Sequence, residues 1–220
     1  MDIKSKYREK GIESFKTEFN LFLFKHTISG RINDMKPEEL LAEFEKNEIS
    51  QEIRVTYISK YWAAYTEQQK IGGLTIKQIT DIMKPWQETD KGKANLEKLA
   101  LVKKLSERFF ENHFKSVFPY EDFERMCKDA KECAYCHINK DAVQELIEKG
   151  RLYNKHPTRG WEFEIDRKFP NIEYSDENCV ICCYWCNNAK TDEFNYYEFM
   201  PIGKEIQKVW EARLGRRIIN

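Results

Sequence analysis

The stretch NCVICCYWCN, residues 178–187, holds four of the seven cysteines of the chain. A second stretch, CAYC at residues 133–136, holds two more cysteines with two residues between them. A CxxC turn places two thiolates on one side of a knuckle, and two such turns supply the four ligands of a tetrahedral zinc site. Because four protein ligands fill the coordination shell, this spacing predicts a zinc ion with a structural role.

The longer stretch contains two overlapping CxxC pairs, at residues 179–182 and 183–186. The first pair lies in the β-prone run CVIC, in which successive side chains point to opposite faces. The second pair is followed by Asn-Asn-Ala-Lys, which favours a turn into a helix. We therefore expect the zinc ligands to be Cys133, Cys136, Cys183 and Cys186. We expect the other cysteines to be small core residues, namely Cys127, Cys179 and Cys182.

The composition is that of a folded globular protein. Hydrophobic residues make up 41% of the chain, with only nine glycines and six prolines, which excludes a collagen-like or disordered chain. Residues 1–10 are polar and lack the apolar region of a signal peptide, and the apolar run FNLFLF is far too short to cross a bilayer. We expect a soluble, cytoplasmic protein, in which thiols bind metal and do not form disulfides.

The charge balance limits the class of partner. The chain has 37 basic and 37 acidic residues, so its formal net charge is zero. Proteins that coat nucleic acid without sequence preference are often basic overall, and this chain is not. A basic stripe on one face is still compatible with the composition.

Residues 1–125 are predicted to be mostly helical. Apolar side chains recur at helical spacing in five segments, namely 12–26, 35–47, 53–73, 74–86 and 95–118. Pro37 suits the first turn of the second segment, and the pair Gly72-Gly73 suits the end of the third. Residues 73–86 also allow a helix-turn-helix, although packing in a core is favoured for this short amphipathic segment. We expect this region to serve DNA recognition or dimerisation.

The residue pattern of the sequence changes near residues 120–130, and we place a second region at residues 126–220. In it, WEFEID (161–166) alternates apolar and acidic side chains, which is the period of a half-buried strand ending at Asp166. A polar loop follows, then CVIC as a second strand, then a helix that begins near Asn187. The order strand, loop, strand, helix, with zinc at its ends, predicts an α+β protein.

The order of these motifs resembles the HNH nucleases, also called the ββα-metal or His-Me finger family. The motifs are CxYC, EIDRKxP, YxxxN and CxxCNxxK, between residues 133 and 190. Residues 194–213 resemble the tail of restriction endonucleases in the four-cysteine branch of this family. The resemblance covers about residues 130–215 and does not extend into the N-terminal half.

The resemblance implies a role for each matching residue. Asp166 and Asn187 would bind a catalytic divalent cation such as Mg²⁺, for which hard oxygen ligands are suited. Asn178 would brace the loop between the two strands. The residues implied to contact nucleic acid are Arg167, Lys168 and Lys190.

The chain departs from the family at Arg167, where most members have the histidine that activates water. Arginine stays protonated at neutral pH, so it clamps phosphate but does not accept a proton. The general base is then metal-bound hydroxide or another side chain, with four candidates: Tyr135, His137, His156 and Tyr174. We favour Tyr135 or His137, because the first knuckle is expected to pack near the strand pair.

Taken singly, these residues also have structural explanations, since Asp166 suits a surface ion pair and Asn187 a helix cap. Their order and spacing favour an enzyme that hydrolyses double-stranded DNA. We expect a sequence-specific type II restriction endonuclease that works as a homodimer. The alternatives are a homing or defence nuclease of looser specificity, and a non-catalytic zinc module that binds nucleic acid or protein.

Overall fold

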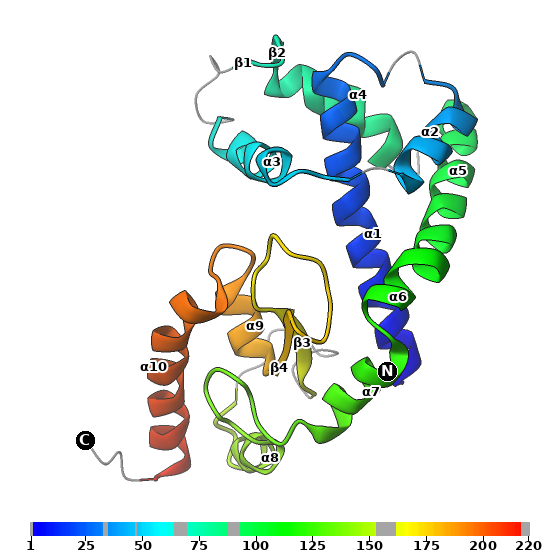
Figure 1. The fold of residues 1–220 in the computed structure, drawn as a ribbon. Helices are drawn as coiled ribbons and strands as arrows, with labels where there is room; N and C mark the ends of the chain where they lie inside the picture. Colours follow the sequence, from blue (N-terminus) through cyan, green and yellow to red (C-terminus); the bar gives the residue numbers. More distant parts are fainter. Residues whose placement is uncertain are drawn as a thin grey trace. The chain divides into compact units, whose positions relative to one another are not determined.

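The computed structural model describes residues 2–32, 35–46, 48–63, 70–87, 93–152 and 162–216, and Figure 1 labels most of its helices and strands. The chain divides into two compact units. We call them the helical unit, Arg8–Ser116, and the cysteine unit, Met1–Tyr7 with Val117–Asn220. The many helices and two small antiparallel sheets agree with the expected α+β class.

The helical unit begins within a long first helix. Its elements are α1 (Ile3–Ile28), α2 (Pro37–Glu45), α3 (Gln51–Ala63), β1 (Lys70–Ile71), β2 (Leu74–Thr75), α4 (Ile76–Gln87), α5 (Lys93–Phe109) and a π-helical turn, η1 (Phe110–Phe114). The short helix α6 (Lys115–Val117) leads into the cysteine unit. The single helix predicted over residues 95–118 is therefore interrupted by the π-helical turn.

The core of the helical unit is built on α1, which carries the fully buried Phe22 and Phe24. The ring of Phe44 from α2 meets that of Phe22 edge-on, with the ring centroids 5.3 Å apart. Aromatic pairs in this geometry add to the stabilisation from buried apolar area. Helix α4 contributes its apolar side to the same core through Ile79 and Met83, which agrees with core packing for residues 73–86.

The glycine pair ends a strand, not a helix, which corrects the prediction for residues 53–73. Strands β1 and β2 pair antiparallel, with Ile71 opposite Leu74, so that Gly72 and Gly73 form the whole loop. Both glycines have positive φ, 58° and 81°. Two-residue hairpin loops favour this left-handed backbone because it matches the twist of the strands, and glycine adopts it without steric cost.

A cavity of about 980 Å³ lies within the helical unit. Its wall includes Phe15 and Phe19 of α1, Trp86 of α4 and Val102 of α5. The wall is mainly apolar, and the cavity is partly open to solvent.

The cysteine unit contains α7 (Tyr120–Asp129), α8 (Lys140–Glu148), β3 (Glu164–Arg167), β4 (Cys179–Cys182), α9 (Tyr184–Lys190) and α10 (Tyr196–Leu214). Helix α8 was missed by the sequence analysis. Its start is marked by Asn139, whose side chain accepts a hydrogen bond from the backbone of Ala142 at 2.8 Å. Val143 and Leu146 then turn the apolar side of the helix into the core.

Strands β3 and β4 form the predicted antiparallel pair, with Ile165 opposite Ile181 and Asp166 opposite Val180. Helix α9 follows β4 directly and packs against β3 (Figure 1). The strand–loop–strand–helix order expected from the sequence is therefore present. The face of β3 that carries Glu164 and Asp166 packs against α9, where we had expected a polar surface facing solvent.

Helix α10 packs closely on the first cysteine knuckle. A Cβ atom added to Gly203 would lie only 2.7 Å from the carbonyl oxygen of Tyr135, so glycine allows the backbones to approach. Phe199, from the same helix, meets the ring of Tyr135 edge-on with centroids 5.1 Å apart. The knuckle is thus covered from one side by α10.

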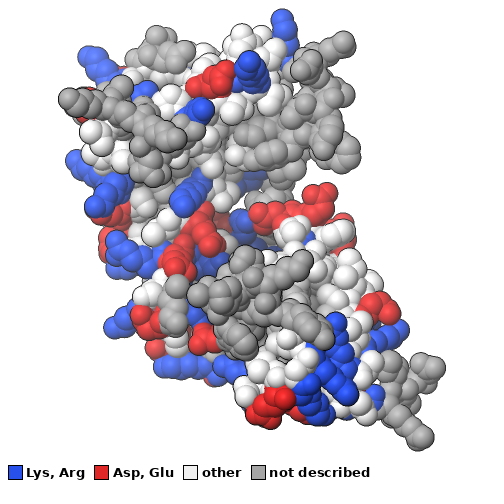
Figure 2. Space-filling model, turned by 180° about the vertical axis from the view of Figure 1, so that it is seen from behind, with Lys and Arg blue, Asp and Glu red and all other residues white. Residues whose placement is uncertain are grey.

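In the described part of the chain, no helix combines the length and apolar character needed to cross a bilayer. Figure 2 shows Lys and Arg side chains interspersed with Asp and Glu over the face in view, in keeping with the balanced charge.

Candidate functional site

Four cysteines from two knuckles meet in the cysteine unit, and they are the four chosen from the sequence. The Sγ atoms of Cys133, Cys136, Cys183 and Cys186 all lie within 4.8 Å of one another, and all four residues are buried. Around a tetrahedral zinc ion with bonds of about 2.3 Å, the sulfur atoms are about 3.8 Å apart. The Sγ atoms of Cys136 and Cys183 are 3.6 Å apart. The cluster therefore fits a structural metal ion such as zinc.

Backbone hydrogen bonds shape the first knuckle. The amide of His137 donates to the carbonyl of Cys133 at 3.0 Å, and His137 itself has a positive φ of 55°. The amide of Ala134 donates to the carbonyl of Ile181 at 3.0 Å, which fastens the knuckle to β4. The geometry of the first CxxC turn is therefore fixed by the sheet as well as by the metal ligands.

The second knuckle is the start of α9. Cys183 is the N-cap residue of the helix, and its Sγ accepts from the amide of Cys186 at 3.5 Å. The competing pair belongs to the strand instead, since Cys179 and Cys182 are the first and last residues of β4 and are both buried. Burial raises the pKa of the Cys182 thiol well above its ordinary value, so this cysteine stays protonated.

Two residues of β3 face two residues of α9. Glu164 and Asp166 lie two positions apart on the strand and therefore share a face. Asn187 and Lys190 lie about one turn apart on the helix. The Nδ2 of Asn187 donates to Glu164 Oε2 at 2.6 Å, and the Nζ of Lys190 lies 3.1 Å from Asp166 Oδ2. We call these four residues the polar cluster.

The carboxylate of Asp166 is buried, with 8% of the residue exposed. Its Oδ2 accepts a hydrogen bond of 2.5 Å from the hydroxyl of Tyr135, in the first knuckle. Burial raises the pKa of Asp166, and the hydrogen bond from Tyr135 and the charge of Lys190 oppose that shift. The first cysteine knuckle and helix α9 thus both hold this carboxylate in place.

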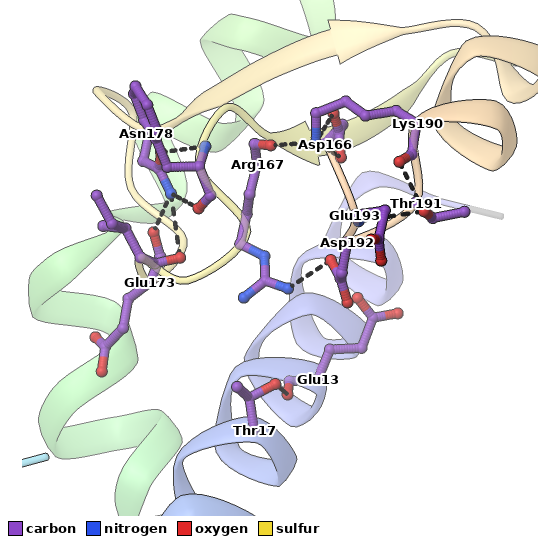
Figure 3. A network of polar contacts seen from close by, with 12 residues as sticks. Glu13, Thr17, Asp166, Arg167, Glu173, Asn178, Lys190, Thr191, Asp192 and Glu193 are labelled. Carbon is purple, nitrogen blue, oxygen red and sulfur yellow. Dashed lines mark hydrogen bonds and ion pairs between the residues drawn. The ribbon is translucent and has the colours of Figure 1, made fainter. Parts of the chain in front are cut away.

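Lys190 does not face phosphate as we had expected. The residue is completely buried, and its ammonium group also donates to the backbone carbonyl of Arg167 at 2.8 Å (Figure 3). The physical reason is that Asp166 is buried on the face of β3 that packs against α9, and a buried carboxylate needs a nearby opposite charge. The prediction that Lys190 contacts nucleic acid therefore fails in this structure.

Arg167 and Lys168 are also engaged within the unit. The guanidinium of Arg167 lies 3.1 Å from the carboxylate of Asp192 and 5.0 Å from the ring centroid of Tyr174 (Figure 3 shows the ion pair). The Nζ of Lys168 donates to the carbonyl of Glu177 at 2.7 Å. The Arg167 side chain is only 11% exposed, whereas that of its partner Asp192 is 80% exposed.

The structure separates the candidates for a general base. Tyr135 is fully buried, and burial together with the charge of Asp166 raises its pKa, so it keeps its proton and cannot act as a base. Tyr174 is buried beside Arg167. His137 is exposed, with Nδ1 2.7 Å from Glu132 Oε1. His156 lies outside the described residues.

Asn178 braces the loop between β3 and β4, as expected. Its Nδ2 donates to three backbone carbonyls at 2.9–3.1 Å, and its Oδ1 accepts from the amide of Phe169 at 3.0 Å. The three carbonyls belong to Phe169, Ile172 and Glu173. One buried amide side chain thus replaces the regular hydrogen bonding that the loop backbone lacks.

Glu164 and a group of surface cations were not predicted from the sequence. Glu164 is two residues before Asp166, and the alternation of the strand could have placed it on the same face. The surface cations gather where the last turns of α8 and α10 meet, and their donors reach carbonyls or the carboxylate of Glu145. They are Lys149, Arg151, Arg213 and Arg216. No sequence signal joined these two helix ends, which lie more than 60 residues apart.

Comparisons of the chain with models of known protein families, with curated proteins and with solved structures found no match. The resemblance to HNH nucleases therefore rests on the motifs, and the function built on it is a proposal.

Proposed function

We propose that this protein is a metal-dependent HNH-type endonuclease that hydrolyses phosphodiester bonds in double-stranded DNA. The observation that supports the proposal is the polar cluster, in which Asp166 of β3 and Asn187 of α9 belong to two facing surfaces beside the four-cysteine cluster. Both residues stand where the motifs place the ligands of the catalytic cation.

The donor set of the polar cluster is suited to Mg²⁺ or a similar cation. Carboxylate and amide oxygens are the hard ligands that this ion takes. The amide nitrogen of Asn187 donates to Glu164, so its oxygen is directed elsewhere and can serve as a ligand. The carboxylate of Asp166 retains lone pairs beyond those used by Tyr135 and Lys190. When bound, the cation would stabilise the negative charge that develops on the phosphate.

The side chains around the polar cluster supply positioning. The Arg167 side chain is only 11% exposed, but its partner Asp192 lies at the surface, so Arg167 would hold a phosphate with its planar fork by exchanging that partner. Among the described candidates for the base, His137 keeps an imidazole near the surface, whereas Tyr135 is committed to Asp166. In this proposal Arg167 binds phosphate, and His137 is the base left by elimination, since Tyr135 is buried and bound to Asp166.

The four surface cations are proposed as a DNA contact. They expose basic groups on the cysteine unit, and phosphate contacts of this kind position a protein on the duplex without reading its sequence. Sequence specificity and a homodimer, in which symmetric half-sites are cut together, remain our first choice among nuclease types. Cleavage of a plasmid into discrete bands supports this choice, whereas a smear favours a nuclease of looser specificity.

The test is plasmid cleavage by the zinc-loaded protein with Mg²⁺, with and without a chelator, comparing wild type with Asp166→Asn. We expect Asp166→Asn to lower the cleavage rate by about 100-fold or more, because the variant loses a charged ligand of the cation. Asp129→Asn, an exposed position at the end of α7, is the matched control and should cleave normally. Equal cleavage by both variants would contradict the proposed metal site.

A second candidate is a zinc module that binds nucleic acid without cutting it. The observation that favours it is the ion pair between Lys190 and Asp166, since a carboxylate that already has a counter-ion has less need of a metal. Together with arginine at position 167, it describes a site without an evident base. This candidate predicts an intact plasmid that migrates more slowly in a gel when the protein is added.

A further inference from the structure

The ammonium group of Lys190 occupies an unusual place for a lysine. It is completely buried, 3.1 Å and 3.4 Å from the two carboxylate oxygens of Asp166 and 2.8 Å from the carbonyl of Arg167. Lysine is almost never fully buried unless it is paired. All three contacts are with oxygen atoms, so the ammonium sits in an oxygen-lined place such as a small cation would take.

A divalent cation at Asp166 would share the same carboxylate with this ammonium. Like charges repel each other more strongly as they approach and as water is excluded, and both conditions hold at a buried carboxylate. Tyr135, the other partner of Asp166, is a neutral donor and brings no such repulsion. Lys190 is therefore the partner that opposes cation binding.

The position of Lys190 at the end of α9 also allows its ammonium group to move when a cation binds. Lys190 is the last residue of α9, and the next residue, Thr191, leaves the helix with a positive φ of 53°. Asn187, the other proposed ligand, lies on the same helix and is held separately by Glu164. A shift of the lysine at the helix end thus need not move Asn187.

We propose that Lys190 is a tethered counter-ion of Asp166 that competes with the divalent cation and sets the cation concentration at which the site fills. This inference rests on the proposed function, because it concerns the same metal site. In this positioning role, Lys190 holds the carboxylate of Asp166 in place until a divalent cation binds to it.

The experiment measures Mn²⁺ binding to the zinc-loaded full-length protein by isothermal titration calorimetry. In Lys190→Met the side chain keeps its length but loses its charge, so we expect Mn²⁺ to bind about tenfold more tightly than to wild type. The matched control is Lys208→Met, which removes an exposed cation paired with Glu205 on α10 and should leave the affinity unchanged. Lys190→Gln, which keeps a donor without the charge, is the second variant if Lys190→Met does not retain zinc and helicity.

The outcomes separate this inference from the proposed function. Tighter Mn²⁺ binding in the Lys190 variants supports the counter-ion role, and a merely structural lysine would not produce it. Equal or weaker binding in folded variants overturns the inference and leaves the metal site standing. Absence of Mn²⁺ binding in wild type and variants alike overturns both. A gain in melting temperature on adding Mn²⁺, larger in the variant than in wild type, is the supporting second readout.

Discussion

The folds of the two units of the molecule are stabilised in different ways. The helical unit has a core of aromatic and aliphatic side chains, five of them phenylalanines that are less than a tenth exposed and belong to α1 and α2. In the main core cluster of the cysteine unit, five of the thirteen buried residues described are cysteines, and four of these form the four-cysteine cluster that could hold a metal ion. One unit depends on buried apolar area, and we expect the other to depend on metal coordination as well. The proposed chemistry lies in this second unit.

The largest expected effect comes from breaking the metal cluster. Cys186→Ser removes one ligand, and structural zinc contributes about 10–16 kcal/mol of apparent binding free energy in small zinc domains. We expect the cysteine unit to lose its fold while the helical unit keeps its own. Hydrogen exchange read by mass spectrometry, together with the zinc content, measures this.

Cys127→Ser is the matched control, because this half-buried thiol lies outside the cluster. It should retain a full equivalent of zinc. If Cys186→Ser kept both zinc and protection from exchange in α9, the contrast between the units would be wrong.

A smaller effect is expected from a substitution in the other unit, in the core of the helical unit. Phe22 is fully buried and contacts Phe44, so Phe22→Ala should lower the free energy of unfolding by about 3–5 kcal/mol. Chemical denaturation followed by circular dichroism measures the loss. Zinc content should not change, and release of zinc by this variant would show that the units are not energetically separate.

The sequence predicted the parts of the fold that depend on local pattern. The spacing of cysteines and the helix-forming residues after Cys186 were enough to choose the ligand pair over Cys179 and Cys182. The alternation around Ile165 was enough to predict β3. The bracing role of Asn178 came instead from the resemblance to HNH nucleases, and its hydrogen bonds agree with it.

The predictions that were wrong concern features that depend on interactions between distant segments. Nothing near Lys190 in the sequence indicates that Asp166 is buried beneath it, because that burial follows from the packing of α9 on β3. Tyr135 suggested a base until the residue was found to be buried, with its hydroxyl donating to Asp166. The pair Gly72-Gly73 is compatible with both a helix end and a hairpin, and only strand pairing decides between them.

The next expected effect concerns the loop that carries the end of β3. Asn178→Ala removes four hydrogen bonds to the loop backbone, and we expect a loss of about 2 kcal/mol in the free energy of unfolding. Asn188→Ala is the matched control, since Asn188 is exposed and its side chain bonds, among the described residues, only to the carbonyl of Tyr184 in its own helix. We expect its change to stay within about 0.5 kcal/mol. Equal losses in thermal or chemical denaturation would remove the bracing role.

The smallest expected effect is a pH dependence confined to the helical unit. The His26 side chain is buried, with its ring 4.4 Å from that of Phe22. Its Nδ1 has no hydrogen-bond partner among the described residues. Burial lowers its pKa below the ordinary 6.5, although the charge of Glu43 opposes the shift. The folded state therefore binds a proton less readily than the unfolded state.

The sign of the effect follows from this difference in proton affinity. Above about pH 6.5 the histidine is neutral in both states, and its contribution to stability is fully present. As pH falls below 6.5, the unfolded state takes up the proton first, so the helical unit loses stability until pH passes the folded pKa. His26→Gln cannot titrate and should lose less stability between pH 7 and pH 5 than wild type, as measured by denaturant midpoints. Parallel losses in the two proteins would show that another group causes the pH dependence, and the buried histidine would then have no part in it.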